Sequence, residues 1–238
     1  MHHYTRILFL LLVGLNAFSQ KSPDRIKIEG LIEKAQKKYA SAPNFQFSAV
    51  YQLFGSYKSS TVSETYKGVF AKNKNDSYAK IHTTEFVKLN TINIKVDNES
   101  KLMQVTKDVK GNEDLFPYQL GELLSNFNDF KVSSTDMEWI CTLTAPKVTF
   151  VPYGKVILHI NKKDYSLTKQ IMFLLQQNQY TDSKGKKLIG YPRLEITFSK
   201  VLWNSDAYAP KFELSSYIYQ SKNKYHVSKK YKSYQIVD

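Results

Sequence analysis

The 238-residue sequence has few of the residues that form disulfides, turns and metal sites: one cysteine, nine glycines, seven prolines and five histidines. A single cysteine cannot form a disulfide within the chain, which excludes a disulfide-rich fold. Cys141 lies between Ile140 and Leu143 in a strand-like run. We interpret it as a small core residue, and a reactive thiol is the other interpretation.

The motifs of common enzymes are also missing. The sequence has no G-x-S-x-G, no G-x-x-x-x-G-K-[ST] and no G-x-G-x-x-G. His82, His159 and His226 have no histidine, cysteine or carboxylate at ligand spacing within their own segments. We therefore expect no enzyme activity, no metal site and no cofactor. No period of 20–50 residues recurs, which argues against solenoids and propellers.

Long apolar runs are confined to the first residues. Arg6 precedes an apolar run over residues 7–15, and Ala17-Phe18-Ser19 follows as a small-x-small cleavage site. The run is about half of the ~20 residues that a transmembrane helix needs. We predict a cleaved signal peptide over residues 1–19 and a soluble periplasmic protein. No Pro/Ser-rich linker divides residues 20–238, so we expect one domain there.

The charge is strongly of one sign, +13 for the full chain. Export changes what this charge implies. In an exported protein, anionic lipid head groups or an acidic protein are more natural partners than nucleic acid. We expect transient contact with an anionic membrane and no nucleic-acid binding.

What the sequence does contain indicates β structure. Seventeen tyrosines and fourteen phenylalanines favour strands. Alternation of apolar and polar residues predicts about ten or eleven strands. They cover residues 45–53, 63–72, 77–83, 85–89, 91–97, 101–109, 138–145, 154–162, 166–182, 191–204 and 210–219.

Two segments have helical spacing instead. Residues 25–40 place apolar side chains on one face and lysines on the other, and Ala42-Pro43 ends the pattern. The apolar positions of this first helix are Ile28, Leu31, Ile32, Ala35 and Tyr39. A second helical face consists of Leu120, Leu123, Leu124 and Phe127. We predict a mainly β (α+β) fold, a strongly curved antiparallel sheet or half-open β barrel of about ten or eleven strands, with amphipathic helices covering its concave side.

The segment KQIMFLLQQ, residues 169–177, is apolar on both faces of a strand. Ile171, Phe173 and Leu175 share one face, and Met172 and Leu174 share the other. Such a strand must be covered on both sides. Either helices and loops cover it as ordinary core, or one face lines an apolar cavity for a hydrophobic ligand.

The C-terminal segment YQSKNKYHVSKKYKSYQIVD interleaves tyrosine with lysine. One interpretation is an edge strand whose lysines discourage pairing with other chains. The other is a patch of rings and cations for lipid head groups or nucleic acid.

The order of these segments resembles a known family. A signal peptide, an amphipathic helix and NFQFSAVYQ…ETYKGVFAKN are similar to the start of the periplasmic outer-membrane lipoprotein carriers, the LolA-like proteins. The later succession of strands and a D-x-x-G hairpin is similar too. In this chain the matching positions are Asp164, Asp182, Gly185, Ile196, Phe198, Ser199, Phe212 and Leu214.

The resemblance implies a periplasmic carrier that holds the acyl chains of lipoproteins, or a related lipid, in an apolar cavity and shuttles them toward the outer membrane. It also implies an inner-membrane release complex and an outer-membrane acceptor as partners. The family often has Arg-Pro after the second strand, and this chain has neither there. Lys72 or Lys74 would have to replace that arginine as the head-group contact, without its bidentate geometry.

Alternation and the resemblance together give the candidate residues. Those expected to line the cavity are Phe45, Phe47, Tyr51, Leu53, Phe70, Ile81, Met172, Leu174, Ile196 and Phe198. Those expected to form a lid are Ile28, Leu31, Ile32, Leu120, Leu123, Leu124 and Phe127. Two alternatives remain open: an envelope-stress adaptor of the same fold that binds a protein partner, and a structural or assembly factor of the envelope.

Overall fold

The computed structural model describes residues 21–89, 92–107, 121, 124–182, 184–222 and 224–237. Within these ranges the chain forms one α-helix and 17 strands, with a few short 3-10 helices. The signal peptide predicted for residues 1–19 lies outside the described residues, as do Leu120 and Leu123 of the second predicted helix. Among the described residues, none lies in a helix long and apolar enough to cross a membrane.

Helix α2 (Pro23–Ser41) is the first element and confirms the helix predicted over residues 25–40. Ser22 caps its start, because its hydroxyl accepts a hydrogen bond from the backbone N–H of Arg25 at 3.2 Å. The helix ends where Ala42 turns to extended backbone just before Pro43, which disfavours helix in the preceding residue. Its buried residues are the five that the periodicity predicts: Ile28, Leu31, Ile32, Ala35 and Tyr39.

Thirteen strands form one large sheet. Their order is β17-β6-β5-β4-β3-β2-β1-β13-β10-β9-β8-β7, and β14 pairs with the start of β1 beyond β13. All neighbours are antiparallel except β17, which runs parallel to β6. The bounds are β1 Asn44–Phe54, β2 Val62–Asn73, β3 Asp76–Ile81, β4 Thr84–Leu89, β5 Ile92–Asp97, β6 Leu102–Lys107, β7 Asp129–Ser134, β8 Glu138–Thr144, β9 Tyr153–Asn161, β10 Leu167–Leu174, β13 Arg193–Phe198, β14 Leu202–Trp203 and β17 Gln235–Val237.

The remaining elements are short. Two hairpins stand apart from the large sheet: β11 (Asn178–Thr181) with β12 (Lys187–Gly190), and β15 (Ile218–Ser221) with β16 (Lys224–Val227). The 3-10 helices are η2 (Leu124–Asn126), η3 (Ala209–Phe212), η4 (Leu214–Ser216) and η5 (Lys229–Tyr231).

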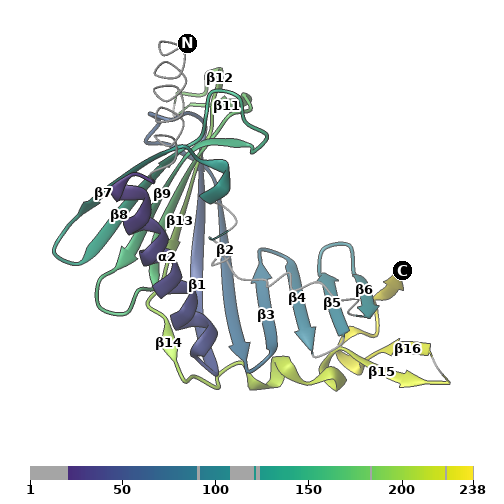
Figure 1. Cartoon of the computed structure of the whole chain (residues 1–238). Helices are drawn as coiled ribbons and strands as arrows, with labels where there is room; N and C mark the ends of the chain where they lie inside the picture. The colour runs from purple at the N-terminus through teal and green to yellow at the C-terminus, as the bar shows by residue number, and fades with distance from the viewer. Residues whose placement is uncertain are drawn as a thin grey trace, which may run out of the picture.

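The large sheet is strongly curved and does not close, since β17 and β7 are its two ends. Figure 1 shows α2 lying across the half that contains β7, β8, β9 and β13, while β3–β6 extend away to the other side above the C-terminal segment. The predicted curved, half-open antiparallel sheet is therefore confirmed.

Several predicted strand bounds were wrong. The strand expected over residues 166–182 breaks at residues 175–177, and the one over 191–204 breaks at residues 199–201. Strand β7 was not predicted. Residues 210–217 of the last predicted strand form η3, η4 and a turn, where the N–H groups of Lys211 and Tyr217 donate to the carbonyls of Tyr208 and Leu214 three residues earlier rather than to a neighbouring strand. The expected count of ten or eleven strands was therefore too low.

The sheet carries a separate hydrophobic core on each side. We call the side that α2 covers the helix face; its core includes Phe47 and Phe70. The opposite face has its own core, in which Tyr78 and Val87 pack with Tyr217 and with Tyr231 of the C-terminal segment. The two cores meet at β2 and β3, whose adjacent residues point to opposite faces. This explains why strand β3 has three consecutive buried residues at its centre.

Candidate functional site

One row of apolar side chains crosses six neighbouring strands on the helix face. Residues that lie directly opposite each other in a ladder share a face. Strand registers place six side chains in such a line: Leu53, Leu194, Met172, Val156, Leu143 and Phe130. At about 4.8 Å between adjacent strands, the row spans about 24 Å. We call this line the apolar row.

Burial changes along the apolar row. At the β7 end Phe130, Leu143 and Val156 are buried, with exposed fractions of 6%, 0% and 0%. At the β1 end Met172, Leu194 and Leu53 are only half-buried. Helix α2 lies over the β7 end, where the guanidinium of Arg25 is 5.0 Å from the centre of the Phe130 ring. The row is therefore covered at one end and partly open at the other.

The predicted cavity residues fall into two groups. Five are buried in the helix-face core: Phe45, Phe47, Phe70, Ile196 and Phe198. The four phenylalanine rings meet at Phe47, which stacks on Phe45 at 6.2 Å and on Phe70 at 5.0 Å and meets Phe198 edge-on at 5.9 Å. These rings fill space beneath the helix. The other five are half-buried: Tyr51, Leu53, Ile81, Met172 and Leu174.

The predicted lid residues that the structure describes are all buried. Ile28, Leu31 and Ile32 form the inner side of α2. Leu124 and Phe127 pack into the same core, where Phe127 stacks on Tyr153 at 6.0 Å. Leu124 lies in a 3-10 turn rather than in a long helix.

Polar contacts hold α2 along its edges. Its lysine ammonium groups lie over aromatic rings of the sheet side: Lys27 over Trp139 at 4.0 Å, Lys34 over Tyr165 at 5.2 Å and Lys38 over Trp203 at 4.9 Å. These three lysines are exposed, and such contacts contribute about 0.5–1 kcal/mol each at exposed sites. Most of the attachment therefore comes from the apolar inner side of the helix.

The two predicted head-group lysines have different surroundings. Lys72 donates hydrogen bonds from Nζ to the carbonyl oxygens of Tyr39 and Ala40 in the last turn of α2, at 3.2 and 3.1 Å. Cations are favourable at this end of a helix. Lys74 is exposed in the β2–β3 turn with a φ of 54°. To contact a head group, Lys72 would have to break its hydrogen bonds to the end of α2. Lys74 is already exposed and could contact a head group where it is.

Strand β10 accounts for the apolar segment KQIMFLLQQ. Met172 lies opposite Leu194 on the helix face. Phe173 is on the opposite face, where the Tyr57 ring meets it edge-on at 5.2 Å and the Lys155 ammonium lies 3.8 Å from its centre. Ile171 to Leu174 are all half-buried. Each face of the strand is thus partly covered, and neither is ordinary sealed core.

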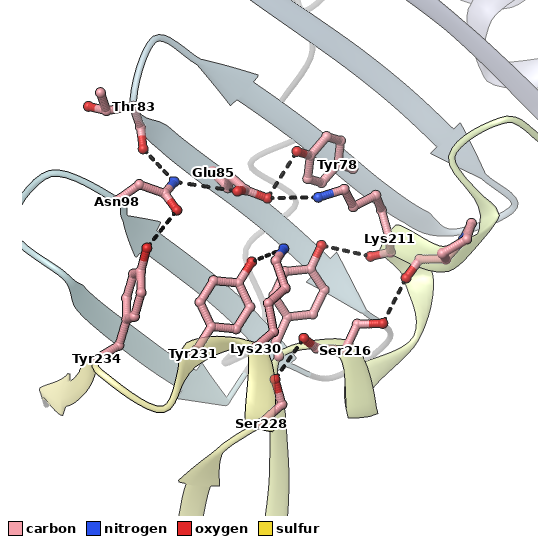
Figure 2. Close-up of polar contacts among 12 residues, drawn as sticks. Tyr78, Thr83, Glu85, Asn98, Lys211, Ser216, Ser228, Lys230, Tyr231 and Tyr234 are labelled. Carbon is pink, nitrogen blue, oxygen red and sulfur yellow. Dashed lines mark hydrogen bonds and ion pairs between the residues drawn. The ribbon is translucent and has the colours of Figure 1, made fainter.

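A buried polar cluster on the opposite face was not predicted (Figure 2). Glu85 is 3% exposed, and one carboxylate oxygen accepts hydrogen bonds from the Tyr78 hydroxyl at 3.0 Å and from Lys211 Nζ at 3.2 Å. Asn98 links it to the C-terminal segment, since its side-chain oxygen accepts from the Tyr234 hydroxyl at 3.0 Å. The sequence does contain one indication of this cluster. Glu85 shares a strand face with the apolar residues Val87 and Leu89, and a charged residue on such a face needs a buried partner.

The charge of Glu85 is stabilised in this cluster. Burial raises the pKa of its carboxyl group, but the Lys211 ammonium and the hydrogen bonds from Tyr78 and Lys211 outweigh burial and hold the pKa below its ordinary value of 4.5. Burial and the nearby Glu85 charge raise the pKa of Tyr78. The cluster ties the C-terminal segment to the sheet. It borders an open cleft of about 400 Å³ whose lining includes Lys211, Lys229 and Lys230.

Two further titratable groups, His159 and Cys141, lie on opposite faces of the sheet. His159 contacts Glu138 at 2.9 Å on the opposite face of β8 and β9. Cys141 is fully buried, as the core interpretation predicts. Within the part of the chain that the structure describes, no three His, Cys, Asp or Glu side chains are placed to hold a metal ion.

No protein-family model matches the sequence, and no curated protein matches it either. Among solved structures, the chain is similar to an uncharacterized conserved protein from Thermus thermophilus, at 10% identity over 89% of this chain and 98% of that one, with a TM-score of 0.46. It is also similar to the Pseudomonas aeruginosa MucA/MucB complex structure, at 10% identity over 84% of this chain and 62% of that one, with a TM-score of 0.43.

A LolA superfamily protein from Nitrosomonas europaea is similar at 12% identity over 74% of this chain and 93% of that one, with a TM-score of 0.34. The superfamily expected from the sequence motifs is thus among the similar structures.

Proposed function

We propose that the protein binds an acyl chain of a lipoprotein, or of a related lipid, against the helix face of its sheet and carries it across the periplasm toward the outer membrane. The change in burial along the apolar row supports this proposal most directly. The row is apolar over six strands, but α2 covers only one end of it, so half-buried side chains continue from a sealed core toward solvent.

The energetics favour a movable cover. Burial of an acyl chain stabilises a complex by about 0.8 kcal/mol per CH₂, so a sixteen-carbon chain would contribute about 12 kcal/mol. A carrier with that full affinity would not release its cargo. If the cargo displaces the apolar side of α2 from the row, the free energy of the lost helix contacts reduces the net binding free energy of the acyl chain. Ile28, Leu31 and Ile32 are the side chains that would exchange with the acyl chain.

The ends of the apolar row would then have different roles. Leu53, Leu194 and Met172 would meet the chain first, since they are half-buried before α2 moves. Val156, Leu143 and Phe130 would become available only after the helix moves. An inner-membrane release complex and an outer-membrane acceptor would load and unload the protein in this scheme.

Native mass spectrometry with a lipid-modified peptide tests the proposal, and the same peptide without its acyl chain is the ligand control. Met172→Glu places a charge in the apolar row and should abolish the bound mass. Ile171→Glu is the matched control, because Ile171 is also half-buried but lies on the opposite face of the same strand. Equal loss in both variants, or no bound mass in the wild type, would contradict the proposal and favour a protein-binding adaptor.

A further inference from the structure

Several loops gather at one end of the large sheet, which we call the tip. They are residues 55–61, 145–152, 175–177 and 191–192, together with the β11–β12 hairpin. Backbone hydrogen bonds join them: the N–H of Leu175 donates to the carbonyl of Pro152 at 2.9 Å, and the N–H of Leu174 donates to that of Pro192 at 3.0 Å. The hairpin packs beside Gly55, where an added Cβ would lie 2.1 Å from the Tyr180 ring.

The tip exposes large apolar side chains. Phe150 is fully exposed, and the exposed fractions of Val148 and Ile189 are 85% and 72%. Leu175 and Tyr191 are also exposed, each at 43%. Single exposed apolar residues are ordinary, but several on adjoining loops mark a contact surface.

The loop that carries Phe150 is held in shape. Its sequence APKVTFVP has a proline near each end, which fixes the backbone dihedral φ there. The N–H of Val151 donates to the hydroxyl of Thr149 at 3.3 Å, and the N–H of Ala145 donates to the carbonyl of Gly154 at 2.9 Å. The loop therefore holds Phe150 and Val148 out in solvent by its own geometry.

Positive charge surrounds these side chains. The tip loops and the hairpin turn carry five exposed lysines and one acidic residue, Asp182. The Asp182 carboxylate accepts hydrogen bonds at 2.9 Å from the backbone N–H groups of Lys184 and Lys186, so it stabilises the hairpin turn. The five lysines are Lys58, Lys147, Lys184, Lys186 and Lys187.

We propose that the tip docks on an anionic lipid bilayer, with Phe150 and Val148 inserted among the lipids and the lysines against the head groups. Apolar side chains that insert beside a cationic rim combine hydrophobic and electrostatic membrane attraction. The apolar side chains stand on separate loops rather than forming one flat patch, which fits a deformable lipid surface better than a protein face.

The tip also adjoins the half-buried end of the apolar row. Leu53 is two residues before Gly55, and Leu194 is two residues after Pro192. Leu143 at the covered end is likewise two residues before Ala145. Docking would therefore bring the row, including its open end, to the membrane, where a lipoprotein acyl chain resides. This last step rests on the proposed function, whereas membrane docking itself does not.

Vesicle sedimentation tests the docking, with phosphatidylcholine vesicles that contain or lack phosphatidylglycerol. The wild type should bind the anionic vesicles and lose binding as salt rises. Phe150→Ser should weaken binding about tenfold. Replacing Lys184, Lys186 and Lys187 by Gln should weaken it about fivefold per lysine.

A depth probe separates insertion from surface adsorption. Phe150→Trp should shift its fluorescence to the blue with anionic vesicles and be quenched by brominated acyl chains. Met137→Trp is the matched control, because Met137 is 66% exposed at the other end of strand β8 and should not respond. Equal responses at both positions would overturn the proposal. Equal binding to both vesicle types, or no binding to either, would also overturn it. Self-association that depends on Phe150, in place of vesicle binding, would overturn it as well.

The two proposals fail separately. Phe150→Ser should still take up an acyl peptide from solution, since it leaves the apolar row intact. A wild type that binds anionic vesicles but takes up no acyl peptide would contradict the carrier function and leave docking standing. Acyl uptake without vesicle binding would overturn docking alone.

Discussion

The Nζ of Lys72 on strand β2 lies 3.2 Å from the carbonyl oxygen of Tyr39 in the last turn of α2. This contact fixes the C-terminal end of the helix to the middle of the large sheet. At its other end the helix is held to β7, where the N–H of Val132 donates to the Asp24 carboxylate at 3.2 Å. The proposed lid is therefore tied by polar contacts at both ends and by apolar contacts between them.

Removal of the Lys72 tie should loosen the helix. Lys72→Met keeps most of the side-chain stem but removes the donor and the charge at the helix end, and we expect a loss of about 1 kcal/mol in the free energy of unfolding. Urea denaturation measures it. Lys74→Met, at the exposed turn two residues later, is the control and should leave stability unchanged. A loss for Lys72→Met that is no larger than the loss for Lys74→Met would show that this tie does not stabilise the helix.

The buried thiol of Cys141 should report helix opening. Cys141 is fully buried on the helix face beside α2, and burial raises the pKa of its thiol to about 12. A thiol reagent should therefore label the native protein far more slowly than the unfolded chain. Lys72→Met should accelerate the labelling under native conditions. If the native protein is labelled as fast as the denatured one, Cys141 is not sealed by the helix.

Acid should weaken the attachment of the C-terminal segment. The pKa of Glu85 is lower in the folded protein than its ordinary value of 4.5. The stability that this group contributes is thus present above pH 4.5 and is lost as the pH falls through the lower folded pKa. Glu85→Gln should remove this part of the acid dependence of unfolding. Glu99→Gln, at an exposed turn, should retain it, and a parallel response of the two variants would contradict the assignment.

A reversible pin tests whether α2 must move. Asp24→Cys with Val132→Cys joins the helix to β7 at positions that are already in contact. Cys141→Ala is needed in the same protein, because Cys141 lies directly opposite Val132 and could pair with the new cysteine. The oxidised protein should fail to load an acyl peptide, and the reduced protein should load it. Equal loading in both states would mean that α2 is not a lid.

Local patterns in the sequence predicted the helix and much of the sheet. The buried side of α2 follows from the spacing of its apolar residues, because a 3.6-residue period indicates an amphipathic helix and identifies its apolar face. These residues are Ile28, Leu31, Ile32, Ala35 and Tyr39. Alternation likewise placed Phe45, Phe47 and Ala49 on one face of β1, where all three are buried. Both inferences use only neighbours along the chain.

Features that depend on distant segments were not predictable in this way. Glu85 is paired with Lys211, which is 126 positions away. Tyr225, Tyr231 and Tyr234 pack on the opposite face, so the C-terminal segment of residues 219–238 is mainly a second covering layer. At its end, β17 is an edge strand of the large sheet, as one interpretation expected. Periodicity shows that a strand has an apolar face, but it does not show which remote segment packs there. For the same reason it could not separate core rings such as Phe47 from half-buried residues such as Met172.

Photocrosslinking from within the acyl chain tests the central claim most directly. A lipid-modified peptide with a diazirine along its chain would be bound, irradiated and mapped by mass spectrometry. The account predicts adducts on Leu53, Leu194 and Met172, and adducts on Val156 or Leu143 when the diazirine lies near the chain end. Adducts on Ile171, Phe173 or the C-terminal tyrosines instead, or none above the level of a non-acylated peptide, would contradict acyl binding on the helix face.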